Sequence, residues 1–274
     1  MKKNLIVFVL LSSFFVKAFA GDFNLLGKQN LFHLTFAREA VLLGGGAAVA
    51  AGGFTMSKIV KFNQKEFDGS LKDKSTVPVF DQLFMAKYSK GLDVTCDILR
   101  IGILAAPVAL FGFTEDKEEW FTIGTMYAES LLWTYGLTEI LKVCVNRARP
   151  YMYYDGAPSK DLENGDWQNS FPSGHTSICF AAAAFSSYVY AMYNPDNNMK
   201  WVITGASFGL AATVGALRMA GGSHYFTDVF TGALIGTVSG FIIPWIHTIQ
   251  PRPKKNRRAD LAVSPAGFYL TLRK

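Results

Sequence analysis

Charged residues are scarce in this chain of 274 residues. Only 18% of the residues are Asp, Glu, Lys or Arg, against about 25% in a typical soluble domain. Half of the residues are hydrophobic, and the mean hydropathy is +0.19. Because the apolar residues also gather in long runs, the composition argues against an ordinary soluble domain and predicts membrane-spanning helices.

Cysteine is also scarce, and repeats are absent from the sequence. Three cysteines are too few for a disulfide framework, and all three lie in predicted helices, where we expect them to pack. The net charge of +6 does not indicate nucleic-acid binding. The basic residues are concentrated at 252–258, after the last apolar run, where a cytoplasmic membrane flank carries them.

The N-terminus has the pattern of an export signal. Lys2 and Lys3 precede an apolar run at 5–16, and residues 18–20 (Ala-Phe-Ala) match a small-x-small cleavage site. We therefore interpret residues 1–20 as a signal peptide cleaved before Gly21. The alternative is that the same segment stays attached as an anchor.

Six further apolar stretches are long enough to form helices, at 40–60, 94–113, 120–143, 176–193, 201–220 and 226–249. The sequence therefore predicts an all-α fold, a six-helix transmembrane bundle, in which functional residues gather at helix ends on one membrane face. Residues 21–119 form an N-terminal region with two spans, residues 120–250 a core, and residues 251–274 a basic tail.

Charged residues fall inside predicted spans, with Asp97 and Arg100 in the first half of 94–113 and Glu129 and Glu139 within 120–143. Arg100, Glu129 and Glu139 would be costly in contact with lipid, so we expect them to face protein. Pairing of Arg100 with Glu129 is one hypothesis, as a structural ion pair rather than a catalytic one.

Basic residues cluster where the 120–143 stretch ends. Lys142 is followed by Arg147 and Arg149, and Pro150 disfavours helix at Arg149. An arginine fork and a lysine ammonium together suit phosphate oxygens. The same residues could instead be the basic flank of a membrane helix.

A second cluster, Pro172-Ser173-Gly174-His175, opens the 176–193 stretch. Helix N-termini carry unpaired backbone N–H groups and partial positive charge, which favours a phosphate-like anion. The Ser173 hydroxyl and the Gly174 N–H could bind such an anion, and His175 could supply a proton to it.

A third cluster lies between the last two stretches. Arg218 ends one, and Gly221-Gly222 permits a reversal. If the next helix begins near His224, then Asp228, four residues on, shares its face and could fix the imidazole tautomer. His224 would then be a plausible nucleophile towards phosphorus, although such a pair could equally be structural.

No metal or other cofactor is expected at this site. Only two histidines are available there, no cysteine or carboxylate cluster accompanies them, and the cations already supply positive charge.

The three clusters together resemble the signature of the type 2 phosphatidic acid phosphatase superfamily. That signature is Lys, six residues, Arg-Pro; then Pro-Ser-Gly-His; then Ser-Arg, five residues, His, three residues, Asp. Ten specified residues match in order and spacing, and they are Lys142, Arg149, Pro150, Pro172, Ser173, Gly174, His175, Arg218, His224 and Asp228. The family serine before the last arginine is Leu217 here, which puts one supporting hydrogen bond in doubt. The resemblance covers residues 120–249.

The resemblance implies a reaction and a role for each residue. It implies that His224 attacks phosphorus and forms a phosphohistidine, that Asp228 orients it, and that His175 protonates the leaving alkoxide and later activates water. It implies that the phosphoryl oxygens are held by Lys142, Arg149, Ser173, Gly174 and Arg218.

The substrate implied is a phosphate or pyrophosphate carried by a lipid, because a headgroup at the interface can reach helix ends without leaving the bilayer. Phosphatidic acid, phosphatidylglycerol phosphate, polyprenyl pyrophosphate and lipid A phosphate are all candidates. The expected location is a bacterial-type inner membrane. With the basic tail cytoplasmic and six spans, the clusters lie on the outer, periplasmic face, and residues 22–39 lie inside. A cleaved signal would instead put residues 22–39 outside, so either the signal stays attached or one stretch, such as 40–60, does not cross.

Two rival functions stay open. A vanadate-dependent haloperoxidase uses the same pocket to hold vanadate, but those enzymes are generally soluble. A non-catalytic lipid-binding or scaffold protein tends to lose the nucleophile or the acid, and this chain has both histidines.

Overall fold

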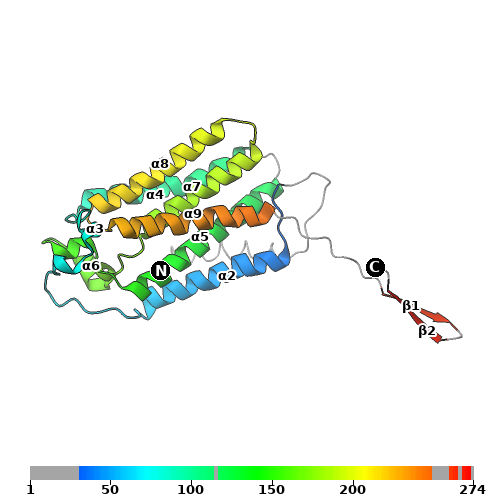
Figure 1. Cartoon of the computed structure of the whole chain (residues 1–274), viewed down its shortest axis with the longest axis horizontal. Helices are drawn as coiled ribbons and strands as arrows, with labels where there is room; N and C mark the ends of the chain where they lie inside the picture. The colour runs from blue at the N-terminus through cyan, green and yellow to red at the C-terminus, as the bar shows by residue number, and fades with distance from the viewer. Residues whose placement is uncertain (1–30, 114–116, 249–258, 265–266, 273–274) are drawn as a thin grey trace.

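The computed structural model describes residues 31–113, 117–248, 259–264 and 267–272. The expected signal at 1–20 and the basic cluster at 252–258 lie outside the described residues. Six long helices form one bundle (Figure 1), namely α2 (Phe36–Phe54), α4 (Lys90–Ala105), α5 (Lys117–Val145), α7 (Gly174–Tyr193), α8 (Met199–Ala220) and α9 (Phe226–Thr248). These helices confirm the six predicted stretches, with bounds that agree to within six residues except at the end of α4, which stops at Ala105 rather than at 113.

Shorter elements connect these helices. A π-helical turn (Thr55–Ile59) extends α2, and a 3₁₀ segment (Ala106–Phe113) extends α4. The remaining short elements are α3 (Val79–Gln82), α6 (Ser159–Asn164) and 3₁₀ turns at Lys74–Thr76, Pro150–Tyr153 and Asp166–Gln168.

The tail contains a β-hairpin that the all-α prediction did not include. Strand β1 (Ala259–Ser264) pairs with β2 (Gly267–Leu272) in antiparallel register. Leu261 and Val263 alternate with smaller residues, which is the two-residue period of a strand. The prediction missed this pattern because the strands are only six residues long.

Helix α7 is enclosed by its neighbours and packs closely against α9. Twelve of its 20 residues are buried. On α9, Gly232, Gly236 and Gly240 recur every fourth residue and so share one helix face. A Cβ atom at any of the three would overlap or crowd the α7 backbone at Ser173, Ser177 or Ala181. Small residues of this kind let two helix backbones approach closely inside a membrane.

Within the part of the chain that the structure describes, three helices are long and apolar enough to cross a membrane by length and composition alone, at Phe36–Ile59, Met199–Ala220 and Phe226–Thr248. Their outer surfaces carry exposed large apolar side chains, as at Trp201 and Leu210 on α8 and Phe230 and Trp245 on α9. The other three long helices differ from these in position, composition or length. Helix α7 is enclosed by its neighbours, and α5 carries the buried side chains of Glu129 and Glu139. Helix α4 has only 16 residues. The chain has the exterior of a membrane protein.

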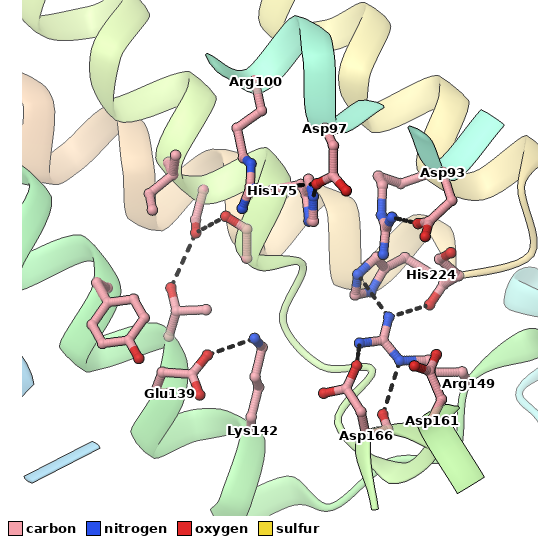
Figure 2. Close-up of a pocket in the computed structure, with 17 residues that line it drawn as sticks. Asp93, Asp97, Arg100, Glu139, Lys142, Arg149, Asp161, Asp166, His175 and His224 are labelled. Carbon is pink, nitrogen blue, oxygen red and sulfur yellow. Dashed lines mark hydrogen bonds and ion pairs between the residues drawn. The ribbon is translucent and has the colours of Figure 1, made fainter. Parts of the chain in front are cut away.

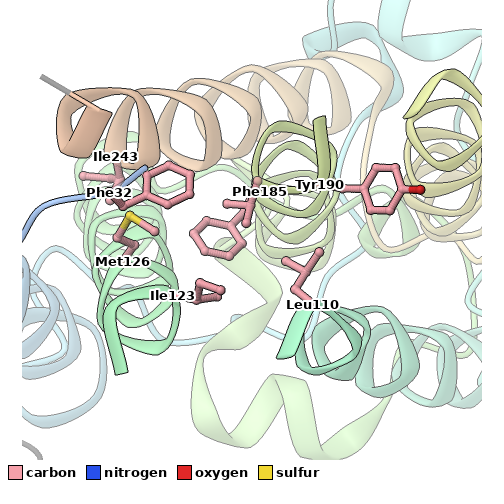
Figure 3. Close-up of a cluster of buried hydrophobic side chains, with 8 residues drawn as sticks. Phe32, Leu110, Ile123, Met126, Phe185, Tyr190 and Ile243 are labelled. Carbon is pink, nitrogen blue, oxygen red and sulfur yellow. The ribbon is translucent and has the colours of Figure 1, made fainter. Parts of the chain in front are cut away.

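The main apolar core lies at the end of the bundle where α2 begins and α9 ends. Figure 3 shows Phe32 and Ile243 beside Met126, with Phe185 between them and Leu110. The segment before α2 and the end of α9 meet here, because the His33 N–H donates to the carbonyl oxygen of His247 at 2.9 Å. The opposite end of the bundle therefore gathers the C-terminal ends of α5 and α8 and the N-terminal ends of α4, α7 and α9.

The predicted pairing of Arg100 with Glu129 is wrong. Arg100 forms an ion pair with Asp97 at 3.0 Å, one turn away on α4. Glu129 is fully buried and lies 3.5 Å from His247 instead. The prediction failed because alternating helix directions place Arg100 and Glu129 at different depths of the bundle.

The close packing of α7 on α9 yields a stability prediction. Gly236→Ala should destabilise the protein by about 1–3 kcal/mol, because the added methyl group overlaps the α7 backbone. The matched control is Gly209→Ala on the outer face of α8, where a Cβ meets nothing within 4 Å. Thermal unfolding in detergent should show a lower Tm for Gly236→Ala only, and equal Tm values would contradict the packing.

Candidate active site

A cavity of about 250 Å³ opens at the end of the bundle where α5 and α8 finish and α4 and α7 begin. Loops 146–173 and 221–225 complete its walls. Figure 2 shows its charged residues, with Lys142 and Glu139 on one side and Arg149, His224 and His175 on the other. All three sequence clusters contribute to it.

Backbone hydrogen bonds hold the three clusters together. The Tyr151 N–H donates to the carbonyl oxygen of Gly222 at 3.0 Å, which joins the first cluster to the third. The Ser173 N–H donates to the carbonyl oxygen of Asp228 at 3.0 Å, which joins the second to the third. Gly222 has a φ of +70°, and a Cβ there would overlap backbone oxygens at 86–87. The turn before His224 therefore requires glycine.

His224 lies at the back of the cavity, in the turn before α9, and is buried. Its Nδ1 is 2.7 Å from the carbonyl oxygen of Ser170, so Nδ1 carries the proton and donates it there. The lone pair then resides on Nε2, which is 3.2 Å from Nη1 of Arg149. Burial first, and then the positive charge of Arg149, hold the pKa of His224 well below its usual value of 6.5. The imidazole is therefore neutral and nucleophilic at Nε2.

Asp228 supports His224 by a different route from the one expected. The sequence prediction began the helix near His224 and paired it directly with Asp228, but α9 begins at Phe226. The Asp228 carboxylate lies 3.6 Å from Nδ1 of His224, beyond hydrogen-bond distance. It accepts from the Ser170 hydroxyl at 2.5 Å and from the Tyr225 N–H at 2.9 Å. Asp228 therefore holds the Ser170 segment, whose carbonyl oxygen in turn orients the imidazole.

Arg147 anchors this arrangement from outside the cavity. Its guanidinium bridges Asp228 and Asp81, each at 2.7 Å, and stacks 3.9 Å above the ring of Tyr225. Burial alone would raise the pKa of Asp81, but hydrogen bonds from Arg147 and Thr227 lower it. Asp81 is therefore a charged partner of Arg147.

Each of the four cationic side chains that line the cavity is paired with a carboxylate. Arg149 pairs with Asp166 at 2.7 Å, and Lys142 pairs with Glu139 at 2.6 Å. The remaining two pairs are Arg218 with Asp93 and Arg100 with Asp97. With Asp161, five carboxylates face four cations and two imidazoles.

These ion pairs hold the cationic side chains in place but do not use all of their N–H donors. An arginine has five N–H donors and a lysine has three, so one carboxylate uses only part of each. The Nε atoms of Arg218 and Arg100 are buried with no hydrogen-bond partner among the described residues. Buried donors without partners are costly. Their position in the cavity wall suits an anion with several oxygens.

His175 lies on the first turn of α7 and lines the cavity. Its Nε2 lies 2.8 Å from Oδ1 of Asp97, which comes from α4. An imidazole that donates from Nε2 to a carboxylate exchanges protons with a substrate through Nδ1. His175 is therefore placed and oriented as a general acid or base.

The helix N-terminus is positioned by Ser173, which does not line the cavity. Ser173 is the N-cap of α7, and its hydroxyl accepts from the Thr176 N–H at 3.4 Å and contacts the Thr176 hydroxyl at 2.9 Å. The structure thus gives Ser173 a capping role, and its role as a phosphate ligand stays a prediction. Gly174 does line the cavity, and a Cβ there would come within 3.1 Å of Nζ of Lys142.

Sequence reasoning missed the carboxylates. Asp93 and Asp166 were given no role, and Asp97 was noted only as a charge in the first half of a span. The one available signal was the spacing of Asp93, Asp97 and Arg100, which places all three on one face of α4. Asp166 begins a three-residue 3₁₀ turn that has no sequence periodicity, so only the folded chain reveals its partner.

Comparisons with known proteins bear on the same residues. Residues 124–252 match the family model described as the PAP2 superfamily. Lipid phosphate phosphatase 1 of Arabidopsis thaliana is 32% identical over 136 residues, covering 42% of this chain and 41% of that protein. Lipid A 1-phosphatase of Porphyromonas gingivalis is 26% identical over 139 residues, covering 51% of this chain and 27% of that protein. The chain thus spans less than half of the length of either relative.

Two solved structures are also similar to the chain. The crystal structure of Aquifex aeolicus LpxE has a TM-score of 0.40 and 24% identity, covering 63% of this chain and 98% of that one. A transmembrane PAP2 type phosphatidylglycerolphosphate phosphatase from Bacillus subtilis has a TM-score of 0.42 and 17% identity, covering 90% and 96%. The similarity to the PAP2 superfamily therefore extends over residues 124–252, the segment that carries both cavity histidines.

Proposed function

We propose that the protein is a membrane-embedded phosphatase that needs no metal for catalysis and hydrolyses a lipid phosphomonoester or pyrophosphate through a phosphohistidine intermediate. The observation that carries the proposal is the neutral, buried His224, whose Nε2 lies 3.2 Å from a fixed arginine in a cavity lined by further cations. The lipid phosphatase names of the curated relatives support the same class of reaction.

In the first step, Nε2 of His224 attacks phosphorus, and the bond between phosphorus and the leaving oxygen breaks. The developing charge lies on the phosphoryl oxygens, which Arg149, Lys142, Arg218 and the Gly174 N–H would bind. Arg149 is held in place by Asp166 and by the carbonyl oxygen of Ser223, at 3.1 Å. Donors that are already oriented need no rearrangement as the charge develops.

His175 would supply the proton that the leaving alkoxide requires. In the second step the same imidazole, now neutral, takes a proton from water as the water attacks the phosphohistidine. Phosphate leaves, and His224 returns to its neutral form. Asp97 would act as a positioning residue, because it holds Nε2 of His175 and leaves Nδ1 for the substrate.

The substrate class follows from where the cavity lies. It opens at one end of a bundle whose outer surface is apolar, so a headgroup at the interface could enter while its acyl or prenyl chains stay in lipid. The bilayer is accordingly the partner that the chain requires. We assign the catalytic core to residues 120–250, supported by residues 21–119, which supply Asp81, Asp93 and Asp97.

We further propose that the cavity faces the periplasmic side of a bacterial-type inner membrane. Residue 33 and residue 247 lie together at the end opposite the cavity. The basic residues at 252–258 follow that end directly, and cytoplasmic flanks are enriched in Lys and Arg. This orientation favours an N-terminal segment that stays attached, because a cleaved signal would put residues 22–39 outside.

Phosphate release from a panel of lipid phosphates by protein in detergent tests the function. The wild type should release phosphate from at least one member, and chelators should leave its initial rate unchanged. His224→Ala and His175→Ala should each lose activity by about a hundredfold or more. Full activity in either variant would contradict the mechanism, and halide oxidation that needs added vanadate would favour the haloperoxidase alternative.

The pKa of His224 can be measured directly, because the chain has only four histidines. In NMR titrations of ¹³C-histidine-labelled protein, the His224 signal should keep the chemical shift of a neutral imidazole as the pH falls through 6.5. Arg149→Met removes a nearby positive charge, so the pKa of His224 should rise in that variant. Ordinary titration of His224 near pH 6.5 in the wild type would contradict the proposed buried, cation-lined setting.

The indirect role of Asp228 gives a third test. Asp228→Asn should lower kcat about a hundredfold, because a small displacement of the nucleophile has an effect of that size. Ser170→Ala and Arg147→Gln should reproduce part of the loss, since both hold the same segment. Asp155→Asn, an exposed aspartate, is the matched control. A loss confined to Asp228→Asn would show instead that the carboxylate acts on the imidazole directly.

A further inference from the structure

A second cluster of titratable side chains lies inside the bundle, away from the cavity. It consists of Glu39 from α2, Glu129 from α5 and His247 from α9, all buried. One ligand atom from each lies within 4.8 Å of the other two. Nε2 of His247 is 3.1 Å from Oε2 of Glu39 and 3.5 Å from Oε2 of Glu129.

The Glu39–Glu129–His247 cluster is separate from the phosphate cavity. Thirteen residues of α5 separate Glu129 from Lys142, which is about 20 Å of helix. Nineteen residues of α9 separate His247 from Asp228, which is about 28 Å. In Figure 1 the start of α2 and the end of α9 lie together at the far end of the bundle from α3 and α6.

Hydrogen bonds around the cluster orient the lone pairs of His247 and Glu39 towards its centre. Nδ1 of His247 lies 2.8 Å from the carbonyl oxygen of Ile243, so Nδ1 donates there and Nε2 presents its lone pair to the carboxylates. Oε1 of Glu39 accepts from the Thr35 N–H at 3.0 Å, which leaves Oε2 facing His247. Metal-ligating histidines and carboxylates are held by outer hydrogen bonds of this kind.

The carboxylate of Glu129 faces another carboxylate, that of Glu39, rather than a hydrogen-bond donor. The Glu129 side chain is fully buried, and neither of its carboxylate oxygens has a hydrogen-bond donor among the described residues. A buried carboxylate without a donor is strongly unfavourable unless a cation or a proton neutralises it. The Glu129 carboxylate therefore points to a missing positive charge at the centre of the cluster.

We propose that Glu39, Glu129 and His247 bind one divalent transition-metal ion of the Zn²⁺ class. Zn–N and Zn–O bonds of about 2.1 Å place neighbouring ligands of a tetrahedral ion about 3.4 Å apart, and the separations of 3.1 and 3.5 Å agree with this. One imidazole with two carboxylates suits Zn²⁺, whereas Mg²⁺ and Ca²⁺ prefer oxygen ligands alone. A fourth position is left for water.

The ion would tie α2 to the catalytic half of the chain. Glu39 is the only ligand from residues 21–119, and the other two ligands belong to α5 and α9 of the proposed core. The inference does not rest on the proposed function, because a structural ion at this end takes no part in phosphoryl transfer. Chelation should therefore lower stability without changing the initial rate of phosphate release.

Titration of tag-free, chelator-stripped protein in detergent with Zn²⁺ or Co²⁺ alone tests the proposal. The wild type should bind one equivalent, Co²⁺ should show the visible absorption of a tetrahedral site, and Zn²⁺ should raise the Tm. Glu129→Gln and His247→Ala should lose all three responses. His175→Ala and His224→Ala should keep them, because both histidines lie in the other site.

Two outcomes would overturn the proposal. Absence of stoichiometric binding by the wild type would mean that protons, rather than a metal ion, neutralise the carboxylates of the cluster. Unchanged binding by a folded Glu129→Gln variant would mean that the metal binds elsewhere. Glu163→Gln, which removes an exposed carboxylate, is the matched control and should bind as the wild type does. If Glu129→Gln does not fold, the Co²⁺ spectrum of the wild type still tests the proposal. The proposal requires the spectrum of a tetrahedral ion with nitrogen and oxygen ligands, and any other spectrum would overturn it.

Discussion

The close contact of α7 with α9 is the constraint on which the rest of the site depends. His175 is the second residue of α7, and His224 stands two residues before α9, so the separation of the two helices sets the separation of the two imidazoles. The glycines at 232, 236 and 240 allow that contact because they carry no Cβ atom. A larger residue on this face would displace one helix and with it one of the two cavity histidines.

Charge balance is the second organising feature. A cavity that held four unpaired cations would be costly in a bundle surrounded by lipid, and carboxylates from α4, α5 and the 146–173 loop offset that cost. The same carboxylates fix the cations in direction, so their remaining donors converge on one small volume. Stability and anion binding are therefore served by one network, and this explains why the N-terminal half of the chain cannot be separated from the site.

Sequence reasoning reached the helices and the cations but not their partners. Long apolar runs in the sequence predicted the six helices. The order and spacing of the three clusters predicted that Lys142, Arg149 and the two histidines lie at one end of the bundle. Contacts such as His175 with Asp97 join residues far apart in the chain and have no local signature. The indirect role of Asp228 depended on whether α9 begins at 224 or at 226, a difference of half a turn that no sequence pattern resolves.

The central claim is that His224 is the nucleophile of the cavity. It is tested most directly by trapping the enzyme during turnover of a ³²P-labelled lipid phosphate, with an alkaline quench that preserves phosphohistidine. Peptide mapping by mass spectrometry should then place the label on His224, and His224→Ala should carry no label. Label on any other residue, or phosphate release without a labelled enzyme under conditions that trap the intermediate, would contradict the account.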